Sequence, residues 1–115
     1  METNEVALSG ELTSIEALRH TPAGIPLLGF KFLHRSRQIE AGLKRQVECE
    51  LNGVAMADVA VAMSRLRPGQ AVRVSGFLNR RNRMSAQLIL HATAAETLKE
   101  DNHGTGTIRQ AQVQG

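Results

Sequence analysis

The sequence contains no tryptophan, no tyrosine and only one cysteine, Cys49. A single cysteine cannot form an intrachain disulfide, which fits a reducing compartment, so the cytoplasm is the expected location. No run approaches the roughly 18 apolar residues of a membrane span, and residues 1–12 lack the basic and apolar regions of a signal peptide. We therefore expect neither membrane association nor export.

Side chains for catalysis or metal binding are also sparse. Cys49 lies on the apolar phase of its segment, which predicts a buried thiol rather than a metal ligand or nucleophile. The histidines show no metal-ligand spacing among themselves; they are His20, His34, His91 and His103. The sequence thus predicts no enzyme, no metal site and no cofactor.

The chain of 115 residues has the length of one domain, which buries roughly two-thirds of the surface that its unfolded chain exposes. Residues 1–98 contain every periodic segment. Residues 99–115 have few apolar side chains and no period. We therefore expect one folded domain over 1–98 and a disordered tail over 99–115.

The net charge of +3 is modest, but the basic side chains are clustered. Residues 1–18 contain four glutamates and no base, whereas residues 19–45 contain six bases and one glutamate. Residues 65–83 contain six arginines and no acid. Because local potential attracts a polyanion, this clustering favours an anionic partner. Eleven of the fourteen bases are arginine, whose guanidinium suits phosphate groups and base stacking.

Five segments alternate apolar and polar residues with the period of two that indicates a half-buried strand. Gly76 interrupts the fourth segment, and a glycine inside a strand commonly marks a bulge or bend, which a small barrel needs in order to close. The segments are residues 5–12, 28–33, 46–52, 72–78 and 87–92.

The period changes between the third and fourth segments. Val59, Met63 and Leu66 recur at i, i+4 and i+7, and Pro68 with Gly69 supplies a stop. This pattern predicts one short helix.

Five strands with a helix between the third and fourth predict an all-β, five-stranded OB-fold Greek-key barrel. Periodicity alone leaves an SH3-like barrel or another small β fold open. An OB-fold binds ligands on strands 2 and 3 and on the loops joining strands 1–2 and 4–5, here expected at His20–Pro26 and Asn79–Arg83. The candidate binding residues fall in these places: Arg19 at the first loop, Arg35, Arg37, Lys44 and Arg45 around the strand 2–3 turn, and Arg80, Arg81 and Arg83 in the strand 4–5 loop.

Four stretches carry a resemblance to a known family: TPAGIP at 21–26, HRSRQIEAGLKRQ at 34–46, GFL at 76–78 and LILHA at 88–92. Together they resemble the primosomal replication protein N (PriB) family, relatives of bacterial single-stranded DNA-binding protein, over residues 6–92. The resemblance implies an OB-fold homodimer that binds single-stranded DNA during replication restart. It also implies that the protein stabilises the PriA helicase at a stalled fork and hands over to later primosome components.

The chain departs from that family at several points. The family's strand 2–3 hairpin carries aromatic residues where this chain has Leu43 and Glu48, which weakens the expectation of base stacking there. The strand 4–5 loop is a short arginine cluster instead of a longer, lysine-bearing loop. The tail beyond Lys99 is longer than in the family.

Only three aromatic residues are available for stacking on bases, as nonspecific single-strand binders normally do. Phe30 and Phe32 share the apolar phase of their segment, which favours the core. Phe77 is out of phase with its apolar neighbours, which leaves three alternatives: a stacking platform, a dimer contact, or a residue returned inward by a bulge at Gly76. A binder with so few exposed rings depends on charge.

Two other functions remain open for the same basic loops. One is a protein-protein adaptor that docks on an acidic surface, and the other is an RNA-binding OB protein. Leu33 and Ile89 lie on the polar phases of their strands, which can mark a subunit contact, although single exposed apolar residues are ordinary. The expectation of a dimer therefore rests mostly on the resemblance.

Overall fold

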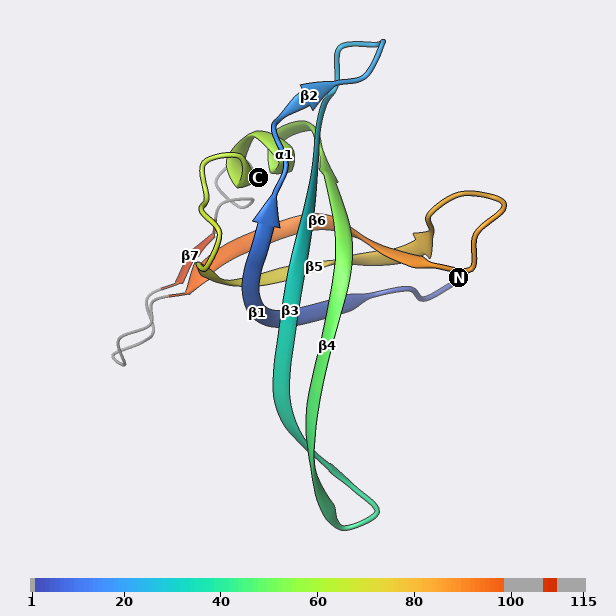
Figure 1. Ribbon diagram of the computed structural model, residues 1–115, viewed down its shortest axis with the longest axis vertical. Helices are drawn as coiled ribbons and strands as arrows, with labels where there is room; N and C mark the ends of the chain where they lie inside the picture. The colour runs from blue at the N-terminus through green and yellow to red at the C-terminus, as the bar shows by residue number, and fades with distance from the viewer. Residues whose placement is uncertain (1, 99–106, 110–115) are drawn as a thin grey trace.

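The computed structural model describes residues 2–98 and 107–109 of the chain. Five of its strands form a closed barrel in the order β1-β5-β6-β4-β3, which closes through pairing of β1 with β3 (Figure 1). Strands β4 and β6 are parallel, and the other neighbours in the barrel are antiparallel. The elements are β1 (Val6–Ile15), β2 (Arg19–His20), β3 (Pro26–Glu40), β4 (Leu43–Met56), α1 (Ala57–Met63), β5 (Ala71–Arg80), β6 (Leu88–Leu98) and β7 (Thr107–Arg109).

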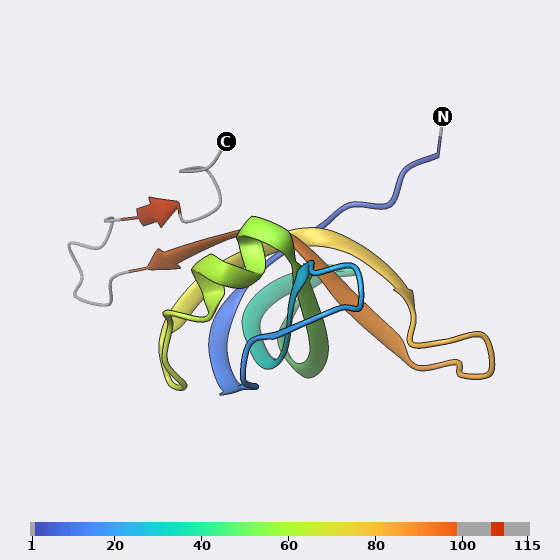
Figure 2. The same cartoon turned by 90° about the horizontal axis from the view of Figure 1, so that it is seen from above.

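This barrel confirms the predicted OB-fold, with β1, β3, β4, β5 and β6 as its five strands. The apolar phases of the strands point inward as expected. Phe32, Val74 and Leu90 are completely buried, and α1 covers one end of the barrel with Ala60 and Met63 (Figure 2). The helix is capped at Ser64, before the Pro-Gly pair that was expected to stop it.

The bulge predicted beside Gly76 is present, with its extra residue in the neighbouring strand. Ser75 pairs with Ala94 and Gly76 pairs with Ala92, so Thr93 of β6 is left over. A Cβ atom at position 76 would lie 1.8 Å from the carbonyl oxygen of His91. Only glycine permits this close approach of the two backbones.

Several boundaries differ from the sequence prediction. The short strands β2 and β7 were not predicted, and the expected first loop gives His20 to β2 and Pro26 to β3. Strand β5 continues to Arg80, so the strand 4–5 loop begins two residues later than expected, at Arg81. Within the tail, β7 pairs with β6, while residues 99–106 and 110–115 lie outside the described residues, so the disordered tail stays a prediction.

Strands β3 and β4 continue beyond the barrel as a two-stranded hairpin, residues 35–48, which we call the arm (Figure 1). Its pairing runs from Arg35 with Glu48 to Glu40 with Leu43. Ala41 and Gly42 make the turn with φ values of 53° and 79°. Two successive positive φ values match the twist of a tight hairpin. The basic stretch at 34–46 is therefore mostly strand and not an irregular loop.

The prediction of a buried Cys49 is wrong, because this residue is exposed. Its phase was read correctly, since Cys49 pairs with His34, whose side chain is buried. However, β4 pairs with β6 only from Asn52 onward. Cys49 precedes this part of β4, so within the described residues β6 does not lie beside it to bury the thiol.

His34 connects the arm to the barrel through buried hydrogen bonds. Its Nδ1 lies 2.8 Å from the carbonyl oxygen of Ser9, and its Nε2 lies 2.9 Å from Oγ of Ser36. Because a carbonyl only accepts, Nδ1 donates to Ser9, and in the neutral imidazole Nε2 then accepts from the Ser36 hydroxyl. Both ring nitrogens are thus engaged in holding the base of the arm.

Candidate nucleic-acid interface

The strand registers place side chains of β3, β4 and β6 next to one another on the outer face of the barrel. Lys31 of β3 pairs with Asn52 of β4, which in turn pairs with Ile89 of β6. One step along the strands, Val54 of β4 pairs with His91. These rows alternate with the rows of the buried core, so their side chains point out of the barrel.

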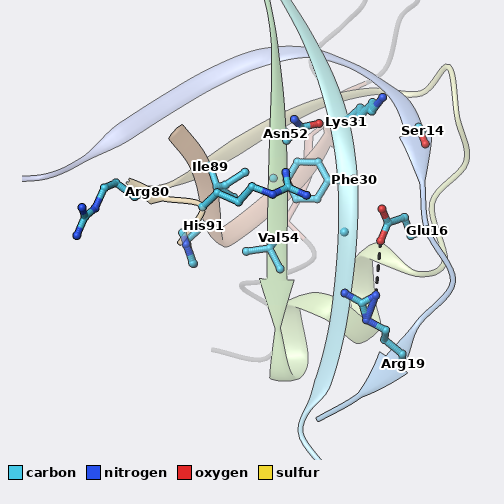
Figure 3. Close-up of a pocket in the computed structure, with 13 residues that line it drawn as sticks. Ser14, Glu16, Arg19, Phe30, Lys31, Asn52, Val54, Arg80, Ile89 and His91 are labelled. Carbon is cyan, nitrogen blue, oxygen red and sulfur yellow. Dashed lines mark ion pairs between the residues drawn. The ribbon is translucent and has the colours of Figure 1, made fainter. Parts of the chain in front are cut away.

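An open groove of about 520 Å³ crosses this face. Its cations come from four separate parts of the chain: Arg19 from β2, Lys31 from β3, Arg80 from the end of β5 and Arg81 from the loop that follows. In Figure 3, Arg80 lies on one side of β4, whereas Lys31 and Arg19 lie beyond β3 on the other side. The groove therefore gathers positive charge from both of its sides.

Most of this charge has no acidic partner in the described part of the chain. Arg19 lies 3.8 Å from Glu16, and both side chains are 59% exposed, so the pair is weak. Among residues 2–98 and 107–109, no ion pair holds Lys31, Arg80 or Arg81. Nη1 of Arg81 donates instead to the side-chain amide oxygen of Gln87 over 3.3 Å. The groove cations thus remain available to an anion.

The cations of the arm are arranged differently. Arg35 and Arg37 line a second hollow of about 470 Å³, and Arg35 is paired with Glu48 over 3.1 Å. The register puts Lys44 on the same face of the arm as these two arginines, opposite Ile39. The arm face is therefore basic, but part of its charge is compensated.

Arg45 and Arg83 do not join either group. Arg45 pairs with Gln38 in the register, so it points to the opposite face of the arm from Lys44, where it lies 3.3 Å from Glu40. Arg83 is exposed in the strand 4–5 loop, where its carbonyl oxygen accepts from Arg80 over 3.4 Å, and it does not line the groove. The eight predicted cations are thus divided among the groove, the arm face and two other positions.

Ten of the thirteen lining residues were not among the predicted site residues, and three of these ten are polar side chains of β3, β4 and β6: Lys31, Asn52 and His91. Each lies on the outer phase of its strand, the phase that the period-two pattern identifies as polar. The predicted site residues were chosen from charged residues in the loops and around the hairpin turn. Polar residues on the outer phase of the barrel strands were not included. That signal was present in the sequence.

The aromatic residues take two distinct places. Phe30 and Phe32 are 3% and 0% exposed, as predicted for the core. Phe77 is 38% exposed on the outer face, where its ring stacks on the imidazole of His91 with centroids 4.8 Å apart. Phe77 is therefore not returned inward by the neighbouring bulge.

The described residues offer little for other chemistry. No helix within 2–98 or 107–109 has the length and apolar content to cross a membrane. In the same part of the chain, no three or more His, Cys, Asp or Glu side chains are grouped as they would be to hold a metal ion.

The fold and groove define a class of protein: an OB-fold barrel with a cationic groove across its second and third strands. Residues 4–94 match a family model described as "another single-strand binding protein family". The chain is 41% identical over 88 residues to the replication restart protein PriB of Nitrosomonas europaea, covering 76% of this chain and 82% of that protein. The chain belongs to the PriB family of single-strand binding proteins.

One solved structure agrees with this membership, and a second shares the fold. The structure of PriB from Ralstonia solanacearum superposes with a TM-score of 0.76 at 28% identity, covering 84% of this chain and 98% of that one. A small single-stranded DNA-binding protein from Streptomyces coelicolor has a TM-score of 0.66 at 19% identity, covering 91% and 99% of the two chains. The second likeness concerns the fold alone.

Proposed function

We propose that this protein binds single-stranded DNA without sequence preference and acts in replication restart. The observation that carries the proposal is that Arg19, Lys31, Arg80 and Arg81 line one groove although they come from four parts of the chain. Cations that neutralise phosphates release condensed counterions, which gives affinity without sequence preference. Membership in the PriB family and the similarity to a replication restart protein support the role.

The proposed path continues from the groove onto the arm. Lys31, Arg35 and Arg37 lie in this order on the outer phase of β3, with Leu33 between the first two, and Lys44 shares that face from β4. Successive residues on one face of a strand lie about 6.6 Å apart, twice the rise per residue, so these side chains form a line and not a point. Arg83, in the loop beside the groove, is a peripheral contact, and Arg45 is the predicted residue that this path leaves out.

The test is a titration of labelled oligo-dT by fluorescence anisotropy at moderate salt. Reversing the loop charges with Arg80→Glu, Arg81→Glu and Arg83→Glu should lower affinity at least about tenfold while leaving the fold intact. The matched control reverses three exposed arginines outside the groove, Arg65, Arg67 and Arg73, with the same change in net charge. An unchanged titration for the loop variant removes the loop from the site, and an equal loss in the control shows that only total charge matters.

The same titrations separate the two alternative functions. An adaptor for an acidic protein should show no saturable binding of oligo-dT at physiological salt. An RNA-binding OB protein should prefer duplex RNA in competition with oligo-dT. Either result would replace the proposal.

We further propose that the bound protein stabilises the PriA helicase on DNA and takes part in the handover to later primosome components. This step is supported by membership in the PriB family. The lifetime of PriA on a forked substrate should increase when this protein is added. A PriA lifetime that does not change would remove this part of the proposal and leave DNA binding untouched.

A homodimer in the cytoplasm is the expected form. Ile89 does not support it, since this residue is 9% exposed and already covered within its own chain, whereas Leu33 is half-buried on the outer face. Light scattering coupled to size exclusion should give twice the chain mass of 12.5 kDa. A mass of one chain across the working concentration range would contradict the dimer.

A further inference from the structure

An apolar hollow, distinct from the hollow on the arm, adjoins the cationic groove on the same outer face of the barrel. It has a volume of about 290 Å³ and is lined by apolar side chains of β4, α1 and β5, together with His91 of β6. Val54 and His91 line both this hollow and the groove, so the two spaces share a wall. A chain lying in the groove therefore passes directly beside the hollow.

The stacked pair of Phe77 and His91 forms part of the lining of the hollow, and His91 also lines the groove. The two residues are direct cross-strand partners, and their rings are parallel within 6°. Phe77 remains 38% exposed beside the imidazole. Met56, which also lines the hollow, is 42% exposed. Two large apolar side chains are thus left open to solvent around one hollow.

The chemistry of the lining selects among the parts of a nucleotide. Val54, Met56, Val59 and Phe77 offer apolar contact, and the lining contains no Arg, Lys, Asp or Glu. The Thr93 hydroxyl already donates to the carbonyl oxygen of Ser75 over 3.4 Å. A phosphate gains nothing in such surroundings, whereas the flat, weakly polar face of a base does.

We propose that this hollow is a nucleobase subsite, which takes a base of the strand whose phosphates lie in the groove. The base contacts the Phe77–His91 pair and the apolar side chains opposite it. Few hydrogen-bonding groups line the hollow, so the subsite accepts any base. This inference rests on the proposed function, because the strand in the groove delivers the base.

The test compares two labelled oligonucleotides of equal length, one of dT and one with abasic sites throughout. Phe77→Ala should weaken binding of oligo-dT about fivefold or more and leave binding of the abasic strand unchanged, because stacking needs a base. Phe77→Leu, which keeps apolar volume but removes the ring, should show an intermediate loss. The matched control is Met84→Ala, since Met84 is 94% exposed and lines neither space.

The outcomes separate the subsite from the proposed function. If the wild-type protein binds neither strand, both proposals fail. If the wild type binds oligo-dT and Phe77→Ala binds it equally well, the subsite alone is overturned. If Phe77→Ala loses affinity equally for the dT strand and the abasic strand, the subsite is also overturned. The ring would then maintain the structure of the groove and would not contact a base. Thermal unfolding followed by circular dichroism shows whether each variant retains the fold.

Discussion

The barrel and the arm are made from the same two strands, yet they differ in packing and in charge. Inside the barrel, β3 and β4 have further strands beside them, and residues such as Phe32 are completely buried. In the arm they pair only with each other, and Ile39 and Leu43 remain 68% and 58% exposed. Backbone pairing alone is enough to shape a hairpin, whereas burial needs a second layer.

The basic side chains of the groove and of the arm also differ in how many of them are paired with an acid. Three of the four groove cations have no acidic partner within residues 2–98 and 107–109, whereas two of the four arm cations are paired with glutamates. A count of basic residues in the sequence does not distinguish these two regions. The positive charge that is available to a ligand therefore depends on whether the neighbours of each cation include an acid that pairs with it.

The difference in packing between the barrel and the arm should produce the largest change in stability. Phe32→Ala should lower the free energy of unfolding by about 3–5 kcal/mol, because it leaves a cavity in the closed barrel. Ile39→Ser in the arm should change it by no more than about 0.5 kcal/mol. Urea unfolding followed by circular dichroism measures both. Similar losses in the two variants would show that the arm is packed in solution, for example by a second subunit.

The two faces of the arm supply the next contrast. Arg37→Gln should weaken binding of oligo-dT about threefold, because Arg37 continues the line of cations from the groove. Arg45→Gln should change it less than about 1.5-fold, since Arg45 points to the opposite face. The pair of variants carries the same change in charge. An equal loss in both would show that DNA contacts both faces of the arm.

Salt dependence tests the same distinction without relying on a single affinity. In a plot of log affinity against log salt, Arg81→Gln should reduce the slope by about 0.7, the value for one phosphate contact on a single strand. Arg45→Gln should leave the slope unchanged. Titrations at four salt concentrations measure both slopes. A slope that Arg81→Gln does not alter would remove this residue from phosphate contact.

The smallest expected effect concerns the ion pair on the arm. Glu48→Gln removes the carboxylate that lies 3.1 Å from Arg35, so binding of oligo-dT should strengthen about twofold. Glu2→Gln, remote in sequence and exposed, is the control for the change in net charge. Equal gains in the two variants would assign the effect to net charge and not to the release of Arg35.

Local patterns predicted much of this fold. The period-two segments placed Leu28, Phe30 and Phe32 on the inner phase of one strand, and the change of period located α1. Gly76 indicated the bulge. The short strands β2 and β7 have two and three residues, which is too short for a periodic pattern to be detected.

The residues of the candidate interface were predicted less completely. Clustered charge identified Arg19, Arg80 and Arg81, which line one groove. The predicted set did not contain Lys31, which lies inside an otherwise apolar segment and lines the same groove, and it contained Arg45, which the register of the hairpin places on the opposite face of the arm. Charge density along the chain is a property of neighbours in sequence, and a groove is made by neighbours in space.

The sequence by itself determined which side of each strand a residue occupies, because successive side chains of an extended chain point to opposite faces. Only the tertiary structure decided what covers each face. Cys49 and Phe32 share an inner phase, but Phe32 belongs to the buried core, whereas Cys49 precedes the part of β4 that pairs with β6 and is exposed. Pairing between strands distant in the chain is a long-range event that no local pattern encodes, and that pairing separates the buried core, the cationic groove and the exposed arm.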